Sequence, residues 1–254
     1  MIFAIDIGNS NIVAGCIDNK QSYFVERIST DIQKTSTEYA ILFKNMLELH
    51  GISKKELDGA IISSVVPPIS NTIQDAIKKV TGLDAMLVGP GLKTGLNIKI
   101  DNPAQLGSDL VVGAVAAMDE YPVPLIIIDM GTATTIFCID DSGAFIGGAI
   151  MPGVMVSLES LTNRTSQLPK ISLEAPKKAI GRNTIDCMKS GLVLANASML
   201  DGMIDKMQAE LAGPATVIAT GGLSQFIIPY CNHEIIWNDT LLLRGLWLIY
   251  QKNC

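Results

Sequence analysis

The sequence predicts an α/β protein built from two similar halves. Hydrophobic residues make up 48% of its 254 residues, whereas aromatic residues contribute only 5%. This composition is typical of buried parallel strands packed between helices rather than of a β-sandwich. In addition, residues 2–17 and 125–140 share one order: an apolar run, an acidic residue, a polar turn with glycine, and a second apolar run. We therefore expect two related halves, each beginning with a strand hairpin.

The first repeated segment is typical of a hairpin of buried strands. Ile2 to Ile7 and Ile12 to Ile17 are apolar, and small polar residues separate them. Asp6 stands near the end of the first strand with Gly8 two residues on, whereas an ordinary two-residue hairpin turn carries Asn-Gly or Asp-Gly. A carboxylate at the end of an apolar strand is costly unless a cation or hydrogen-bond donors meet it, so the turn predicts a phosphate and metal site.

The second repeated segment places Asp129 where the first has Asp6. Leu125 to Asp129 is followed by a polar turn and then by Ile136 to Asp140. The hydroxyl of Thr132 in this turn suits contacts with terminal phosphates or a bound cation. Because two acid-tipped turns are unusual as structure alone, we expect them to flank one nucleotide cleft between the halves. The alternative for each turn is an ordinary polar turn with an incidental acid.

The spacing of apolar residues, and the residues that interrupt it, predict the remaining helices and strands. We expect helices over 36–50, 71–81, 188–211 and 240–252, and strands over 60–66, 85–88 and 216–220. Ser36 or Thr37 is the expected cap of the first helix. Pro67-Pro68 is expected to end the strand before it.

Prolines interrupt the pattern shortly after residue 118, so we expect an N-terminal half of residues 1–118 and a C-terminal half of residues 119–254.

The C-terminal half contains Thr220-Gly221-Gly222 after a predicted strand. This loop allows close backbone approach to a flat nucleoside, and the helix expected after it offers free amides. A simple Gly-Gly turn is the alternative.

Composition and missing motifs exclude several classes. The formal net charge of −6 disfavours nucleic acid as a partner. Five scattered cysteines without CxxC spacing and only two histidines, His50 and His233, predict neither a disulfide framework nor a zinc site. The chain has no P-loop, no GxGxxG after a strand and no GxSxG. Without a signal-peptide pattern or a long apolar run, we expect a cytoplasmic protein that does not enter membranes.

Taken in order along the chain, the motifs closely resemble those of type III pantothenate kinases. The resemblance covers nearly the whole chain and rests on Asp6-x-Gly-Asn9, Asn102-Pro103, Gly107-Ser108-Asp109, Asp129-x-Gly-Thr-Ala-Thr-Thr135, Gly147-Gly148-x-Ile150-x-Pro-Gly153, Leu168-Pro169, Gly181-x-Asn-Thr184, Ser190-Gly191 and Thr220-Gly221-Gly222. It implies a duplicated actin-like, ribonuclease H-like fold. It also implies ATP-dependent phosphorylation of pantothenate, the first step of coenzyme A synthesis, by a homodimer that uses Mg²⁺ and a monovalent cation, K⁺ or NH₄⁺. The dimer helices would belong to the C-terminal half.

By this resemblance, Asp109 corresponds to the catalytic base and Asp129 to the monovalent-cation ligand. Asp6 is also a candidate Mg²⁺ ligand. The implied ATP site comprises Asp6, Ile7, Gly8, Asn9, Ser10, Asn11, Ile12, Val13 and Thr132. The implied pantothenate site comprises Ile100, Gly107, Ser108, Asp109, Leu110 and Thr184. Without the resemblance, Asp109 would be expected to cap a helix over 110–118.

Two residues depart from the family pattern at the implied substrate site. Leu110 stands where the family usually has Arg, and Ile100 where it usually has Tyr. Leucine cannot replace a guanidinium, which binds carboxylates in a fixed fork. Two alternatives to an active pantothenate kinase therefore stay open: a catalytically impaired paralogue that binds nucleotide as a regulatory protein, and a kinase of a related small alcohol.

Overall fold

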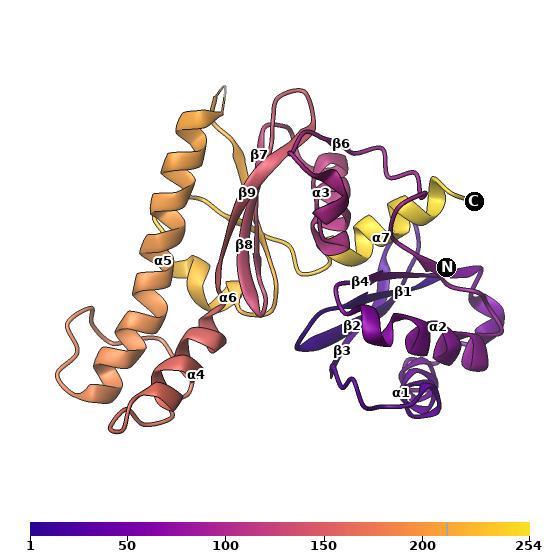
Figure 1. Ribbon diagram of the computed structural model, residues 1–254, viewed down its shortest axis with the longest axis horizontal. Coiled ribbons are helices and arrows are strands. Elements are labelled where there is room, and N and C mark those ends of the chain that lie inside the picture. The colour runs from indigo at the N-terminus through magenta and orange to yellow at the C-terminus, as the bar shows by residue number, and fades with distance from the viewer. Residues whose placement is uncertain (212) are drawn as a thin grey trace. The chain divides into compact units, whose positions relative to one another are not determined.

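The structure is a computed structural model that describes residues 1–211 and 213–254. Its contacts group the chain into two compact units. Unit 1 comprises Met1–Leu96, Asp101–Asp119 and Thr240–Cys254, and unit 2 comprises Asn97–Ile100 and Glu120–Asp239. Each unit combines a mixed β-sheet with helices (Figure 1). Among the described residues, no helix has both the length and the apolar content needed to cross a bilayer.

Unit 1 contains a five-stranded sheet with the order β3-β2-β1-β4-β5. The strand β1 pairs antiparallel with β2 and parallel with β4. The strands are β1 (Ile2–Ile7), β2 (Asn11–Ile17), β3 (Ser22–Ser29), β4 (Gly59–Ser64) and β5 (Met86–Leu87), and the helices are α1 (Ser36–Leu49), α2 (Pro67–Thr81), α3 (Ser108–Glu120) and α7 (Leu241–Gln251), with 3₁₀ turns η1 (Lys54–Glu56) and η2 (Pro103–Gln105).

The strand β1 is buried along its whole length and packs on both faces. Phe3, Ile5 and Ile7 face α1 and α2, whereas Ile2 and Ala4 face α3 and α7. Figure 1 shows α1 and α2 together on one side of this sheet. Successive side chains of a strand point to opposite faces, so a strand with helices on both faces needs an uninterrupted apolar run.

Unit 2 repeats this sheet order. Its order β11-β10-β7-β8-β9-β6, read from β9 to β11, matches β3-β2-β1-β4-β5 strand for strand, with β6 added beside β9. The strand β7 pairs antiparallel with β8 and parallel with β10. The elements are β6 (Asn97–Ile98), β7 (Leu125–Met130), β8 (Ala133–Ile139), β9 (Ala144–Pro152), β10 (Thr216–Thr220), β11 (Ile236–Trp237), α4 (Val154–Arg164), α5 (Thr184–Glu210), α6 (Ser224–Ile227) and the 3₁₀ turn η3 (Ile228–Tyr230).

One face of the unit 2 sheet carries a core with α4, α5 and α6. Ile126, Ile128 and Met130 of β7 contribute to it, as do Val193 and Leu200 of α5. Figure 1 shows α5 along this sheet and α4 beside the lower part of α5. The repeated strand order confirms the predicted duplicated α/β fold.

Most of the predicted elements are confirmed, with corrections at their ends. The cap of α1 is Thr35, whose side chain accepts a hydrogen bond from the Glu38 N–H, rather than Ser36 or Thr37. Pro67 and Pro68 begin α2, because the first positions of a helix do not need a backbone donor. The helix α5 begins at Thr184, four residues before its predicted start. The strands β3 and β9 and the helix α4 were not predicted, because their exposed positions weaken the apolar pattern.

The C-terminal helix α7 lies in unit 1, although a division at 118/119 assigns it to the second half. Leu243, Leu246 and Ile249 pack with α3 and with Ile2 and Ala4 of β1. Helical periodicity showed an apolar face but not which sheet would cover it. The assignment of residues 1–118 and 119–254 as actin-like halves stays a prediction.

The packing of α7 against α3 predicts that Gly245→Ala destabilises the protein. A Cβ at Gly245 would collide with the Val112 carbonyl oxygen, and crowding of a packed core costs about 1–3 kcal/mol. We expect the free energy of unfolding in urea to fall by that amount. Gly202→Ala in α5 is the matched control, because a Cβ there meets no atom within 4 Å and alanine favours helix. Equal stability of the two variants would contradict this packing.

Candidate active site

The Asp6 turn is closed and held by backbone and hydroxyl hydrogen bonds. The Gly8 N–H donates to the Asn11 carbonyl over 3.0 Å. Thr30, just after β3, holds the turn twice: its Oγ1 donates to the Gly8 carbonyl over 2.6 Å, and its N–H donates to the Ser10 carbonyl over 3.0 Å. Asn9, Ser10 and Asn11 are exposed. The turn therefore presents small polar side chains and backbone on a fixed support.

Only part of the predicted ATP segment has side chains at the surface. Ile7 and Ile12 face each other across the hairpin and are fully buried. Their side chains belong to the core shared with α1 and α2. These two residues can reach a ligand only through their backbone, whereas Asn9 to Asn11 can do so through side chains.

Asp6 lies beside the start of α3. It is 8% exposed and pairs in register with Ser63 of the parallel strand β4. The Ser108 Oγ, at the first residue of α3, lies 3.1 Å from the Ser63 Oγ. It accepts a hydrogen bond from the Ser64 N–H and donates one to the Ser64 carbonyl, both over 3.0 Å. These bonds bring the start of α3 to the sheet edge where Asp6 stands.

Asp109 occupies the first turn of α3 and is half-buried. Its Oδ1 accepts a hydrogen bond from the Leu110 N–H over 2.8 Å. Gly107 leaves room for this carboxylate, because a Cβ there would collide with the Asp109 Oδ1. Burial raises the pKa of Asp109 above the ordinary aspartate value, although the Leu110 hydrogen bond acts in the opposite direction. A carboxyl with a raised pKa is suited to accept a proton.

The second turn, in unit 2, is built in the same way with different residues. The Gly131 N–H donates to the Ala133 carbonyl over 3.0 Å, and the Gly153 N–H donates to the Thr132 carbonyl over 3.1 Å. A Cβ at Gly153 would collide with the Thr132 carbonyl oxygen, so the end of β9 can approach the turn only as glycine. Thr132 is exposed and Asp129 is half-buried.

The loop after β10 packs against Asp129. Thr220 pairs in register with Asp129, and Gly221 has a φ of +90°. A Cβ at Gly221 would lie 2.7 Å from the Asp129 Oδ1, so both the backbone conformation and the space require glycine. The Ser224 Oγ donates to the Gly221 carbonyl over 2.6 Å. The helix expected after this loop is only the four-residue α6, so its amides add little to the exposed backbone.

The oxygen groups around the two acids fit the implied cations. Thr135 stands opposite Asp129 on the same sheet face, and its buried Oγ1 has no hydrogen-bond partner in the described part of the chain. A carboxylate with a free hydroxyl oxygen suits a hard monovalent cation. Within residues 1–211 and 213–254, no group of three or more His, Cys, Asp or Glu side chains could hold a metal ion.

The predicted pantothenate residues fall into two sets. Gly107, Ser108 and Leu110 flank Asp109 at the start of α3 in unit 1. In unit 2, Ile100 is half-buried beyond β6, and Thr184 is the exposed first residue of α5. The Ser108 hydroxyl is already engaged by β4, which gives it a structural task.

Sequence reasoning gave no role to the residues that support the site. Ser63, Ser64, Thr30 and Gly153 hold the turns or α3 through contacts with distant segments. The one local signal was the Ser63-Ser64 pair at the end of an apolar strand, where polar residues follow buried ones at the sheet edge.

Comparisons with known proteins agree on one family. A family model described as type III pantothenate kinase matches residues 2–206. A protein of Halalkalibacterium halodurans named type III pantothenate kinase is 42% identical over 253 residues and covers 100% of both chains. A protein of Bacillus cytotoxicus with the same name is 40% identical over 253 residues, covering 100% of this chain and 97% of that protein.

The fold is also similar to a solved structure, component A of (R)-2-hydroxyglutaryl-CoA dehydratase from Acidaminococcus fermentans. The two structures align with a TM-score of 0.57 at 14% sequence identity, and the alignment covers 98% of this chain and 97% of that one. At this identity the likeness shows the fold alone. It agrees with the duplicated α/β fold that the sheet order shows.

The raised pKa of Asp109 predicts that Asp109→Asn stabilises the fold near neutral pH. The pKa of Asp109 is higher in the folded protein than in the unfolded chain, because burial in the folded state disfavours the charged carboxylate. The free energy of unfolding therefore decreases as pH rises from the unfolded-state pKa through the folded-state pKa. Asparagine is neutral and can still accept the Leu110 hydrogen bond. We expect the variant to unfold at a higher urea concentration than the wild type at neutral pH.

This difference should shrink as pH falls towards about 4, the ordinary aspartate pKa. If the variant were less stable than the wild type at neutral pH, interactions in the folded protein would be stabilising the charged Asp109 carboxylate, and the prediction would be wrong.

Proposed function

The chain belongs to the type III pantothenate kinase family, and we propose that it transfers the γ-phosphate of ATP to a hydroxyl of pantothenate with Asp109 as the base. The product is 4'-phosphopantothenate, made in the first step of coenzyme A synthesis. The observation that supports this role most directly is a half-buried Asp109 with a raised pKa at the sheet edge where Asp6 stands. An acid in this position can orient the hydroxyl and accept its proton.

The Asp6 turn binds the phosphates of ATP in this proposal. Gly8 allows close backbone approach, and the exposed Asn9, Ser10 and Asn11 supply polar side chains. The segment from Asp6 to Val13 contributes in this way, with Asp6 as a ligand of Mg²⁺. Bound Mg²⁺ neutralises charge that develops on the transferred phosphoryl group.

Unit 2 contributes a second set of groups. Thr132 contacts the phosphates of ATP, and Asp129 holds the monovalent cation, K⁺ or NH₄⁺, with the free Thr135 hydroxyl on the same face as a further ligand. The loop Thr220-Gly221-Gly222 provides close backbone approach for adenosine. The orphan hydroxyl beside Asp129 is what supports a cation there.

Pantothenate binds at the start of α3. Gly107 and Leu110 lie on either side of Asp109, while Ser108 positions the helix through β4. Ile100 and Thr184 are further pantothenate contacts by their positions in the family pattern, although Ile100 replaces the usual Tyr.

We also propose that the protein acts as a cytoplasmic homodimer. Unit 2 exposes a set of large apolar side chains on β9, α4 and the segment before and at the start of α5: Ile146, Ile150, Met155, Val156, Leu161, Ile180 and Ile185. Exposed apolar groups of this extent are typical of association surfaces.

The cysteines support the cytoplasmic location in this proposal. All five are free thiols, as is usual in a reducing compartment.

The proposal predicts that Asp109→Asn strongly lowers turnover while ATP still binds. Loss of a general base lowers turnover by about 10²–10⁴-fold. We would measure ADP release, coupled to an indicator reaction, with and without pantothenate in the presence of Mg²⁺ and K⁺. Asp75→Asn in α2, an exposed acid outside the site, is the matched control and should keep full turnover. A wild type that releases no ADP in response to pantothenate would refute the proposal.

Leu110→Arg is expected to lower the KM for pantothenate by roughly tenfold, because an arginine fork can bind its carboxylate. The KM for pantothenol, in which an alcohol replaces that carboxylate, should stay unchanged. Leu110→Met is the control for the size of the side chain. If Leu110→Arg leaves the pantothenate KM unchanged, residue 110 does not face the carboxylate.

A further inference from the structure

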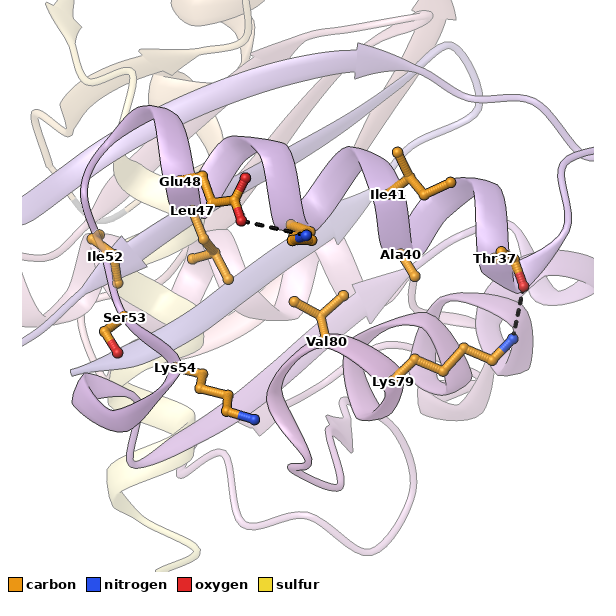
Figure 2. Close-up of a pocket in the computed structure, with 11 residues that line it drawn as sticks. Thr37, Ala40, Ile41, Leu47, Glu48, Ile52, Ser53, Lys54, Lys79 and Val80 are labelled. Carbon is orange, nitrogen blue, oxygen red and sulfur yellow. Dashed lines mark hydrogen bonds and ion pairs between the residues drawn. The ribbon is translucent and has the colours of Figure 1, made fainter.

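A cavity of about 550 Å³ opens in unit 1 between α1 and α2 (Figure 2). Its lysines Lys54 and Lys79 lie near opposite ends of α1. The Lys79 Nζ donates hydrogen bonds to the Ser36 Oγ and the Thr37 Oγ1 in the first turn of this helix, whereas Lys54 follows its end. Since the 14 residues of α1 span about 20 Å, the two ammonium groups cannot bind one anion together, and the lining does not select a ligand.

The start of α5, in unit 2, is not held by the core. In the segment before this helix, Leu168, Ile171 and Leu173 pack on the core of unit 2. The first buried residue of α5 itself is Met188. None of the described residues between Leu173 and Met188 contributes to a core. Because helix ends fray, the turn that carries Thr184 needs support from other contacts.

One support is the helix cap. The Asn183 Oδ1 accepts a hydrogen bond from the Asp186 N–H over 2.9 Å, and the Asn183 carbonyl accepts one from the Cys187 N–H over 2.9 Å. Asn183 makes these bonds, so the exposed Thr184 hydroxyl is available to a ligand. A cap orders the first turn but does not tie the chain before it to the rest of unit 2.

Ser190 provides that tie from the buried part of α5. Its side chain is on a residue only 9% exposed, and its Oγ donates to the Ala179 carbonyl over 2.6 Å. A serine inside a helix often bonds to the carbonyl four residues earlier, whereas this one bonds to a residue that precedes the helix. Helical side chains tilt towards the N-terminus, which directs the hydroxyl to this segment. The hydroxyl therefore serves tertiary packing rather than the helix.

Gly181 brings the same segment onto the first turn of α5. A Cβ at Gly181 would lie 2.4 Å from the backbone nitrogen of Cys187, so only glycine allows this approach. Lys189 also pairs with Glu174, but 58% of the Glu174 side chain is exposed, and ion pairs at the surface contribute little. The bond from Ser190 to Ala179 is therefore the main polar tie between the segment and the helix.

We propose that Ser190 is a positioning residue for the reaction: its bond to Ala179 fixes the start of α5, so that the Thr184 hydroxyl is held ready for pantothenate. This inference rests on the proposed function, in which Thr184 contacts pantothenate. A contact that is fixed in advance avoids the entropic cost of ordering it during binding. Loss of the tie should therefore raise the KM for pantothenate and leave kcat unchanged.

The kinetic test compares Thr184→Ala, Ser190→Ala and the double variant in the coupled ADP assay. Thr184→Ala should raise the KM for pantothenate about tenfold, as expected for one lost hydrogen bond. Ser190→Ala should raise it roughly fivefold, and it should add nothing in the Thr184→Ala background, because it acts through Thr184. The kcat and the KM for ATP should stay within about twofold of the wild type in each variant.

Amide hydrogen exchange, followed by NMR, gives a readout that does not depend on turnover. In Ser190→Ala, the Asp186 and Cys187 amides that bond to Asn183 should exchange roughly fivefold faster, because the first turn opens more often. The amide of Val193, which is buried in α5, should keep its rate. Ser190→Cys, with a similar shape but only a weak S–H donor, should behave like Ser190→Ala.

Thr216→Val is the matched control. The Thr216 Oγ1 also donates to a carbonyl distant in sequence, that of Pro122, but at another place in unit 2. Valine removes this hydroxyl while keeping the shape of the side chain. Both the KM for pantothenate and the exchange of the α5 amides should match the wild type.

An unchanged KM for pantothenate in Ser190→Ala, when Thr184→Ala raises it, would overturn the positioning role and leave the proposed function intact. Unchanged exchange at Asp186 and Cys187, equal effects in Thr216→Val, or a further rise in KM in the double variant would also overturn it. A wild type without pantothenate-dependent turnover would instead refute the proposed function, and the positioning role with it.

Discussion

A carboxylate at the end of a buried apolar strand must be compensated, and this constraint organises both units. In unit 1 the strand β1 is buried throughout and ends in Asp6 and Ile7. In unit 2 the strand β7 ends in Asp129 and Met130. At both ends the chain turns through glycine, and a parallel neighbour strand brings small or polar residues alongside: Ser63 in unit 1 and Thr220 in unit 2. The same strand pairing that buries the core therefore places polar groups beside each acid.

The two units support their turns at the same place in the fold but with different chemistry. In unit 1, Thr30 after β3 donates hydrogen bonds to the turn from its side chain and its backbone. In unit 2, Gly153 after β9 donates only from its backbone and must lack a Cβ to do so. The duplicated fold thus preserves where support is needed, while each unit meets the requirement with the residue that fits its turn.

Asp109 shows how the fold holds a costly group in position. Burial raises its pKa, so the charged form is less favourable in the folded protein than in the unfolded chain. The neighbours Gly107 and Ser108 provide space for the carboxylate and anchor the helix to β4. Stability is commonly sacrificed at sites where a reactive group is needed. Asp109 fits that pattern, because the features that destabilise its charge are those that suit it to accept a proton.

The sequence by itself determined the types of most elements, the duplication and the positions of the acids. Uninterrupted apolar runs predicted β1 and β10 to the residue, because strands buried on both faces leave no ambiguity. Only the tertiary structure decided that α7 joins unit 1, that Ser108 binds the end of β4, and that Gly221 packs against Asp129. Periodicity along a chain records which side of an element is buried. It does not record the partner, since that depends on contacts between segments far apart in sequence.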